Sequence, residues 1–363
     1  MTAIPDGIEV VATGAEAERL PLPPLLVVDA LTEYLDSREI GAGNIGWERI
    51  GDGQSNVTYR ITRGEESLVL RRGPRPPHPR STHDMLREAR IQRLVGDAGV
   101  AVPRIIATCD DESVLGVPFY LMGFLDGIVI TDSIPRPLDS PEQRRATAFA
   151  AVDTLVDLHR VDVSTGKLAK FGRPDGYLAR QVKLFSSLWT QNTTREIPEV
   201  TTLGQWLGEN LPESRRASVV HGDFRIGNLM FASNAPATVV AILDWELATI
   251  GDPLADLGYL TATYATADAA PTPMELTSVT REPGYPGKDE LIARYREQLP
   301  VDVDALPWYQ ALALWKAAIF CEAMYTRWLH GERPGDTFAP TLERGIPALI
   351  EAAGRFSREF NRR

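Results

Sequence analysis

The sequence has few cysteines and no long apolar run. Its two cysteines, Cys109 and Cys321, lie far apart and form no Cys-x-x-Cys pair, so neither a zinc site nor a disulfide framework is indicated. No stretch approaches the roughly 20 apolar residues that a membrane-spanning helix requires. The first residues also lack the basic start and apolar segment of a secretory signal. We therefore expect reduced thiols, no membrane association and a cytoplasmic location.

The sequence also lacks an excess of basic residues. Lys and Arg total 38 against 49 for Asp and Glu, a formal net charge of -11, which repels polyanions. We therefore expect no nucleic-acid partner. The 363 residues, 44% apolar and 24% charged, fit an ordinary folded protein. This length favours two lobes over a single core, and the sequence contains no internal repeat.

The first third of the chain predicts a small lobe that contains strands. Residues 1–22 are small and acidic and predict a flexible arm. Residues 21–37 have the Pro-led start and apolar spacing of a helix. Residues 47–73 alternate β-branched and aromatic residues with polar ones, which predicts strands joined by turns. A helix over 83–99 and two further strands around an acidic turn complete a predicted lobe of residues 23–127.

The remainder, residues 128–363, predicts a larger and mainly helical lobe. Helical spacing dominates from residue 141 onward. It is interrupted by VVHGDFRIGNLMF at 219–231 and by VVAILDWELATIGDPLADLGYL at 239–260, a pattern of strand, tight turn and helix. Residues 264–286 are rich in Pro and Thr and too long for a plain connector, so they predict a lid or substrate loop.

The segment 219–231 places polar residues between two apolar anchors. Asp223 and Asn228 have the spacing D-x-x-x-x-N, and Asp244 follows the apolar run VVAIL. Three oxygen-bearing side chains can therefore converge from two strand–loop segments, and hard oxygen ligands suit Mg²⁺. Taken singly, each residue is more simply a cap, turn or strand-end residue. The ordered set instead indicates phosphoryl transfer.

A second group of residues precedes this segment. GDGQSN, residues 51–56, lies between two predicted strands, where small residues let backbone amides approach phosphate oxygens. Arg71 ends the next strand, and Glu88 lies on the following helix, where it can pair with that cation. Alternatively, Glu88 belongs to a solvated helix face.

The order of these parts resembles the aminoglycoside phosphotransferase family, a branch of the protein-kinase-like superfamily. GDGQSN, VLR, the helical Glu, FYLMGFLDG, HGDFRIGN and LDWE follow one another over roughly residues 40–335, and HGDFxxGN followed by ILDWE is the specific signal. The chain is most similar to a subgroup like the kinase-like domain fused to some acyl-CoA dehydrogenases. The resemblance implies an α+β, two-lobed protein-kinase-like fold that uses ATP and Mg²⁺ to phosphorylate a hydroxyl of a small molecule.

Residue by residue, the resemblance implies roles in the larger lobe. Asp223 would be the catalytic base, and Asn228 and Asp244 would hold Mg²⁺. Asp256 and His221 would brace the catalytic loop from behind. Further contacts to the acceptor would come from the C-terminal helices, although an aromatic stripe at helical spacing is usually core. These implied acceptor contacts are Trp315, Glu322, Tyr325 and Arg327.

The resemblance also implies the nucleotide contacts of the smaller lobe. Arg71 would contact the α and β phosphates, with Glu88 steadying it. Residues 122–125 would line an adenine slot with backbone hydrogen bonds between apolar walls. The implied nucleotide-binding residues are Gly53, Ser55, Asn56, Arg71, Glu88, Met122, Gly123, Phe124 and Leu125.

Two departures from the family pattern affect these expectations. Arg71 replaces the usual Lys, and a planar guanidinium is not equivalent to an ammonium. The triplet at 221–223 is HGD rather than HRD and no APE-like segment follows, so regulation through an activation loop is not expected. A catalytically weak, nucleotide-binding pseudokinase is the main alternative. An acyl-CoA dehydrogenase fits less well, because that chemistry requires a flavin site.

The acceptor and the oligomeric state stay open at this point. An aminoglycoside, a hydroxyacyl thioester, a choline-like alcohol and another metabolite alcohol all fit, and the chain is expected to be a monomer or homodimer. The basic cluster Arg72, Arg75 and Arg80 is either a solvated loop or a contact for an anionic substrate such as a coenzyme A phosphate. His159 is expected to be a packed or capping residue.

Overall fold

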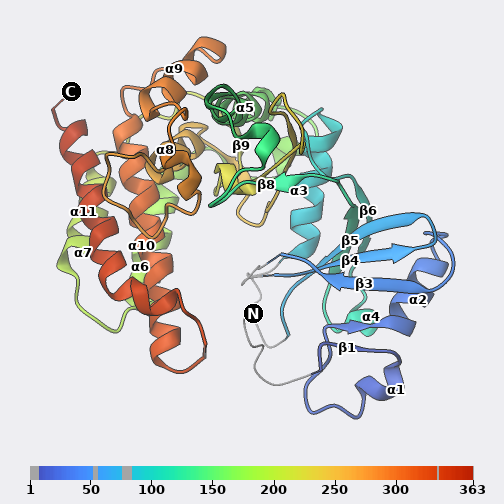
Figure 1. Cartoon of the computed structure of the whole chain (residues 1–363). Coiled ribbons are helices and arrows are strands. Elements are labelled where there is room, and N and C mark those ends of the chain that lie inside the picture. The colour runs from blue at the N-terminus through green and yellow to red at the C-terminus, as the bar shows by residue number, and fades with distance from the viewer. Residues whose placement is uncertain (1–7, 52–55, 76–83, 333–334, 363) are drawn as a thin grey trace. The chain divides into compact units, whose positions relative to one another are not determined.

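The chain folds into two compact units, Ala3–Asp126 and Gly127–Arg363 (Figure 1). The computed structural model describes residues 8–51, 56–75, 84–332 and 335–362. Over these residues no helix has both the length and the apolar character needed to cross a bilayer.

The first unit is built on an antiparallel sheet of five strands in the order β3-β4-β5-β7-β6. Register places Tyr59 opposite Leu70, and Leu70 opposite Leu121. Alternate residues along a strand point to the same face, so these three side chains share one side of the sheet. In chain order the elements are β1 (Val10–Val11), α1 (Gly14–Ala17), β2 (Leu26–Val27), α2 (Val28–Asp36), β3 (Ile45–Arg49), β4 (Val57–Arg63), β5 (Glu66–Arg72), α3 (Met85–Asp97), β6 (Ile105–Cys109), α4 (Glu112–Leu115) and β7 (Phe119–Gly123).

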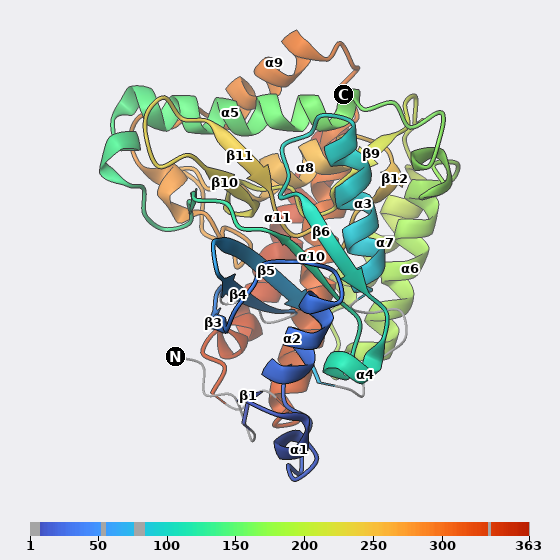
Figure 2. The ribbon, with the colours of Figure 1, turned by 90° about the vertical axis from the view of Figure 1, so that its right-hand side faces the viewer.

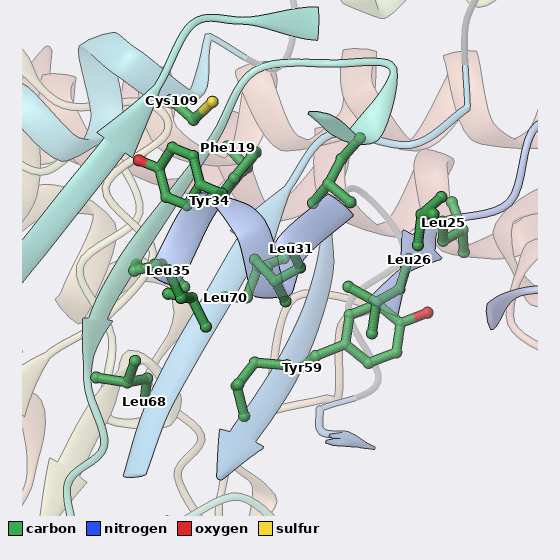
Figure 3. Close-up of a cluster of buried hydrophobic side chains, with 14 of the residues drawn as sticks. Leu25, Leu26, Leu31, Tyr34, Leu35, Tyr59, Leu68, Leu70, Cys109 and Phe119 are labelled. Atoms are coloured by element: carbon green, nitrogen blue, oxygen red, sulfur yellow. The ribbon is translucent and has the colours of Figure 1, made fainter. Parts of the chain in front are cut away.

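Helix α2 covers one face of this sheet and forms the main core of the first unit (Figure 3). Leu31 and Leu35 are fully buried, which stabilises the unit by about 1.5–3 kcal/mol for each side chain. The Tyr34 hydroxyl donates to the Thr108 carbonyl at 3.0 Å. On the opposite face, α3 packs Met85 against the sheet in a second cluster. The residues labelled in Figure 3 are Leu25, Leu26, Leu31, Tyr34, Leu35, Tyr59, Leu68, Leu70, Cys109 and Phe119.

The beginning of the chain differs from its prediction. The described part of the predicted arm contains α1, which has a capping box at Thr13 and Glu16, and β1, which pairs in parallel with β2. The helix expected over 21–37 begins only at Val28. Three prolines in residues 21–24 have no amide hydrogen to donate, and the next residues pair as a strand. The expected acidic turn is the short helix α4, capped by Asp111.

The second unit is mainly helical, so the predicted α+β class is confirmed. Its two small sheets have the orders β11-β10-β8 and β12-β9. In chain order the elements are β8 (Ile128–Val129), η1 (Arg136–Leu138), α5 (Pro141–Arg160), η2 (Leu168–Lys170), α6 (Tyr177–Asn192), α7 (Pro198–Glu209), β9 (Ser218–Val220), η3 (Ile226–Asn228), β10 (Leu229–Phe231), β11 (Val239–Ile242), β12 (Thr249–Gly251), α8 (Leu254–Thr263), η4 (Ser278–Arg281), α9 (Lys288–Gln298), α10 (Leu306–Leu329), η5 (Ala339–Thr341) and α11 (Leu342–Phe360).

Helix α10 is the central helix of the second unit and contacts α6, α8 and α11. Most of its side chains are buried, as expected for a helix that is apolar on all sides. The Trp308 indole donates to the Leu207 carbonyl at 3.2 Å, so this large side chain is buried without an unsatisfied donor. Strands β10 and β11 lie next to α5 at the other side of the unit (Figure 2).

The predicted lid segment, residues 264–286, is held by hydrogen bonds and an ion pair between its own residues. Thr280 Oγ1 donates to the Ala265 carbonyl at 2.8 Å, and the Arg281 guanidinium donates to the Thr266 carbonyl at 2.7 Å. Arg281 also forms an ion pair with Glu275. This segment is thus a folded loop that contains η4, and its role as a lid stays a prediction.

Candidate active site

A buried strand positions the polar residues of the HGDFRIGN segment. Strand β9 pairs with β12 in antiparallel fashion and is buried along its whole length. The chain then turns at Gly222, where φ is +89°. A Cβ at this position would lie 2.9 Å from the Leu247 Cβ and 3.0 Å from its carbonyl oxygen. Glycine is therefore required between His221 and Asp223, because an L side chain meets both an unfavourable φ and a backbone collision.

Asp223 and Asn228 are in direct contact. The Asn228 side-chain amide donates to Asp223 Oδ2 at 2.8 Å and to the Asp223 carbonyl at 2.8 Å. Asn228 is 5% exposed, so this amide is fixed by its surroundings. The other carboxylate oxygen, Asp223 Oδ1, is buried and accepts no hydrogen bond from the described residues. This oxygen lies 3.7 Å from Arg225 Nε, so the two carboxylate oxygens of Asp223 have different surroundings.

Asp244 lies next to this pair. Strands β10 and β11 pair so that the Leu243 amide donates to the Asn228 carbonyl at 2.8 Å. His221 Nε2 hydrogen-bonds to the Leu243 carbonyl at 2.8 Å. Asp244 follows with φ at +63°, a conformation that is uncommon for a non-glycine residue and that concentrates at functional sites. The structure thus brings Asp223 and Asn228 into contact and places the backbone of Asp244 one residue from the Leu243–Asn228 hydrogen bond, and a shared metal site for the three stays a prediction.

Asp256 holds the backbone of this loop. Its Oδ2 accepts from the His221 amide at 2.7 Å and its Oδ1 from the Gly222 amide at 2.8 Å. Oδ2 also lies 3.3 Å from His159 Nε2, and His159 Nδ1 lies 2.7 Å from the Tyr295 hydroxyl. Asp256 and His159 are both fully buried. Of the two expected roles of His159, packed or capping, the packed one is observed.

Three residues near Asp223 carried no signal in the sequence analysis. Burial and then the Asp223 carboxylate raise the pKa of Tyr259 well above its usual value, so its phenol is a hydrogen-bond donor toward Asp223. Arg225 Nε lies 3.7 Å from Asp223 Oδ1. A Cβ on Gly227 would collide with the Arg225 guanidinium and lie 3.2 Å from Thr277 Oγ1. Only the fold brings Tyr259 and Thr277 here, from α8 and from the 264–286 loop.

The oxygen ligands present fit a metal ion shared with a nucleotide. No group of three or more His, Cys, Asp or Glu that could hold a metal occurs in the described ranges. Mg²⁺, however, is usually held by one or two carboxylates together with substrate phosphates and water. The carboxylate of Asp244 and the side-chain oxygen of the fixed Asn228 would supply that number of protein ligands. The set is too small for a cation held by protein alone.

In the first unit, the predicted Arg71–Glu88 pair is present. Arg71 Nε lies 2.9 Å from Glu88 Oε1, with the two side chains 16% and 2% exposed. The Tyr120 hydroxyl donates to the same carboxylate at 3.1 Å. The alternative that Glu88 belongs to a solvated helix face is therefore wrong, because its side chain is buried. The contact of Arg71 with nucleotide phosphates stays a prediction.

The other predicted nucleotide contacts are only partly described. Gly53 and Ser55 lie outside the described residues, and Asn56 is buried at 3% exposure. The Gly123 amide donates to the Arg104 carbonyl at 2.9 Å and the Phe124 amide to the Ser67 carbonyl at 3.1 Å. These two amides are therefore occupied inside the unit, so the backbone hydrogen bonds expected from residues 122–125 to an adenine would have to come from other backbone groups. Met122, on β7, packs against the α3 cluster, and the adenine contact of Leu125 stays a prediction.

The four residues expected to contact the acceptor make structural contacts in the second unit. Trp315 is 1% exposed and its indole donates to the Val200 carbonyl at 2.8 Å. Glu322 is fully buried and pairs with Arg195 at 2.9 Å. The Tyr325 ring stacks on Trp328 and carries the Arg195 guanidinium over its face. Arg327 is exposed and pairs with Glu332 at 3.0 Å. The aromatic residues of α10 are thus used for packing, because this helix is buried on several sides and its large side chains form part of the core.

The basic cluster is likewise structural where it is described. The Arg72 side chain is 1% exposed and donates to the carbonyls of Leu115, at 3.0 Å, and Leu25. Burial lowers the pKa of Arg72 to about 10. Arg75 donates to the Pro23 carbonyl at 2.6 Å. A substrate contact by Arg72 is therefore wrong, because its donors are used inside the core; Arg80 lies outside the described residues.

The β-rich first unit and the mainly helical second unit with its Asp223 loop have the architecture of the protein-kinase-like fold. The family described as the phosphotransferase enzyme family matches residues 46–291. The chain therefore belongs to the phosphotransferase enzyme family, as the resemblance of its motifs predicted.

Curated relatives and solved structures agree with this assignment. The chain is 34% identical over 318 residues to acyl-CoA dehydrogenase family member 10 of Mus musculus, which covers 85% of this chain and 29% of that protein. It thus spans less than a third of that relative. A crystal structure of a candidate aminoglycoside phosphotransferase from Ralstonia eutropha is similar at a TM-score of 0.77 and 27% identity, covering 91% and 98% of the two chains.

A more distant structure shows the fold alone. Spectinomycin phosphotransferase APH(9)-Ia, solved with ADP and spectinomycin, is similar at a TM-score of 0.57 and 11% identity, covering 90% of this chain and 98% of that chain.

Proposed function

We propose that this protein transfers the γ-phosphoryl group of ATP to a hydroxyl of a small molecule. Membership of the phosphotransferase enzyme family supports the class of reaction, and the ADP bound by APH(9)-Ia supports a nucleotide donor. The observation that carries the proposal is the asymmetry of Asp223. One of its carboxylate oxygens is fixed by Asn228 at 2.8 Å, whereas Oδ1 lies 3.7 Å from Arg225 Nε, too far for a hydrogen bond.

The asymmetry suits a general base. The acceptor hydroxyl would donate to Asp223 Oδ1 while its oxygen attacks the γ phosphorus. The new P–O bond forms as the bond between the β and γ phosphates breaks, ADP leaves, and the hydroxyl proton passes to Asp223. Asn228 keeps the carboxylate in place through two hydrogen bonds at 2.8 Å.

Asn228 and Asp244 would hold Mg²⁺ together with the phosphates. The ion, when bound, neutralises charge that develops on the phosphate oxygens. Asp256 contributes indirectly, because it anchors the amides of His221 and Gly222 and so fixes the backbone that delivers Asp223. A fixed base is important because small displacements of reacting groups cost large factors in rate.

The test is ADP release from magnesium-ATP by the wild type and by Asp223→Asn. We expect the variant to lose at least about 100-fold in turnover, the usual contribution of a general base, with an unchanged unfolding midpoint. Asp157→Ala is the matched control, because Asp157 is 68% exposed on α5 of the same unit. Unchanged turnover in Asp223→Asn removes Asp223 from the mechanism.

The same experiment distinguishes the pseudokinase alternative. If magnesium-ATP raises the thermal midpoint of the wild type but no ADP appears with any acceptor, the chain is a nucleotide-binding protein without turnover. The relative called acyl-CoA dehydrogenase family member 10 is a longer protein, of which this chain covers 29%. A purified protein without flavin absorbance is expected.

A further inference from the structure

A lone lysine on α10 stands apart from the contacts described so far. Lys316 Nζ donates to Gln181 Oε1 on α6 at 2.9 Å and lies 4.7 Å from the centre of the Phe185 ring. Among the described residues no carboxylate oxygen lies within 4.0 Å of this nitrogen. An ammonium group has three donors, and the described hydrogen bonds use one. A partly buried cation with a single neutral acceptor has capacity for an anionic ligand.

The position of Lys316 connects it with the Asp223 loop. Burial lowers the pKa of Lys316 to about 8, while the carboxylates of Asp256 and then Asp223 raise it. Both acids therefore act electrostatically on the ammonium, although neither forms an ion pair with it. Helix α10 also contacts α8, which carries Asp256. The ammonium thus lies in the electrostatic environment of the reacting residues.

Two exposed apolar side chains lie on the same helix faces as Lys316 and its partner Gln181. Phe320, one helical turn further along α10, is 43% exposed and packs edge-on against Phe185 with ring centres 5.0 Å apart. Leu184, 51% exposed, lies three residues after Gln181 on α6 and so on the same helix face. Exposed apolar side chains next to one cation match a ligand with a hydrocarbon part and an anionic end.

The same geometry disfavours a cationic acceptor. The face of Phe185 is the kind of aromatic surface that attracts an ammonium ligand, but Lys316 already occupies it. A second positive charge there would be repelled by the first. The aminoglycoside and choline-like acceptors that the sequence left open therefore fit this part of the unit less well than an acid does.

We propose that Lys316 binds an anionic group, a carboxylate or phosphate, of the acceptor, and that Phe320 and Leu184 contact its adjoining hydrocarbon part. This inference rests on the proposed function. It identifies the acceptor class as a hydroxylated organic acid or phosphate rather than an aminoglycoside or an amino alcohol. Lys316 is a specificity residue in this arrangement, and it takes no proton in the reaction.

The test uses acceptors that differ only in charge. ADP release is measured with 10-hydroxydecanoate, 1,10-decanediol, 10-amino-1-decanol and kanamycin, for the wild type and for Lys316→Met, Lys316→Arg and Lys183→Met. Lys183 is an exposed lysine on α6 and is the matched control. We expect the wild type to favour the hydroxy acid by about 10-fold or more over the diol, the size of one charge-assisted hydrogen bond.

The variants separate binding from folding. Lys316→Met should lose that preference through KM, Lys316→Arg should recover part of it, and Lys183→Met should keep it. A preference that survives in Lys316→Met, or a wild type that favours kanamycin or the amino alcohol, overturns the inference.

A binding measurement covers the case in which no acceptor is phosphorylated. The chain has five lysines, so the signals of ¹³C-methylated lysines can be assigned with Lys316→Arg. The hydroxy acid should shift the Lys316 signal and the diol should not; equal shifts, or none, overturn the inference. A shift without ADP release would sustain the subsite while the proposed function fails, so the two failures are distinguishable.

Discussion

Replacing Asp256 by alanine should release the backbone that delivers Asp223. The carboxylate is fully buried. It accepts from the amides of His221 and Gly222 at 2.7 and 2.8 Å and lies 3.3 Å from His159 Nε2. Backbone amide bonds of this length to a carboxylate are strong.

The magnitude follows from the groups that the substitution leaves unpaired. Each buried amide without a partner costs about 1–3 kcal/mol, so the two amides together cost about 2–6 kcal/mol. Asp256→Asn keeps one acceptor oxygen and turns an NH₂ group toward the other amide, so its loss should lie between wild type and Asp256→Ala. Turnover should fall in both variants, because Asp223 loses its fixed position.

The assay combines urea unfolding with amide hydrogen exchange over residues 218–224. Exchange is specific, since it reports the opening of this loop even if the two units unfold separately. We expect faster exchange at His221 and Gly222 in Asp256→Ala and a lower unfolding midpoint, with Asp157→Ala matching the wild type. Equal stability and equal exchange in Asp256→Ala and Asp157→Ala would refute the bracing role.

Other substitutions test the remaining contacts. Glu88→Gln should lower the stability of the first unit by about 2 kcal/mol or more, measured by urea unfolding, because it removes the negative charge that pairs with the mostly buried Arg71 at 2.9 Å; no change would show the charge to be dispensable. Trp315→Ala should lower the free energy of unfolding by about 3–5 kcal/mol in the same measurement, because it creates a cavity. A higher KM for the acceptor with an unchanged free energy of unfolding would instead indicate that Trp315 contacts the substrate. The pKa of Lys316 is lowered to about 8, so its ammonium is present below that pH and lost above it. The KM for the hydroxy acid should therefore rise above about pH 8, and a rise that persists in Lys316→Arg would assign it to another group.

The chemistry-bearing residues were predictable because phosphoryl transfer imposes both residue type and order. Asp223 and Asn228 are five positions apart on one loop, and local chain geometry brings them into contact. The buried strands on either side follow from the apolar runs that flank the motif. Glu88 was harder to assign, since a helix with many charged residues can place any one of them in water. The fold decided it by packing Tyr120 against the carboxylate.

The sequence by itself determined the α+β class, the order of the motifs and the residues of the Asp223 loop, because these depend on short-range periodicity and on spacing along one segment. Tertiary structure alone decided the rest. It buried Trp315 and Glu322 in the helical core, used Arg72 and the amides of Gly123 and Phe124 for internal hydrogen bonds, and placed Lys316 beside Gln181. These outcomes depend on contacts between segments far apart in the chain, and such contacts leave no periodic signal in the sequence.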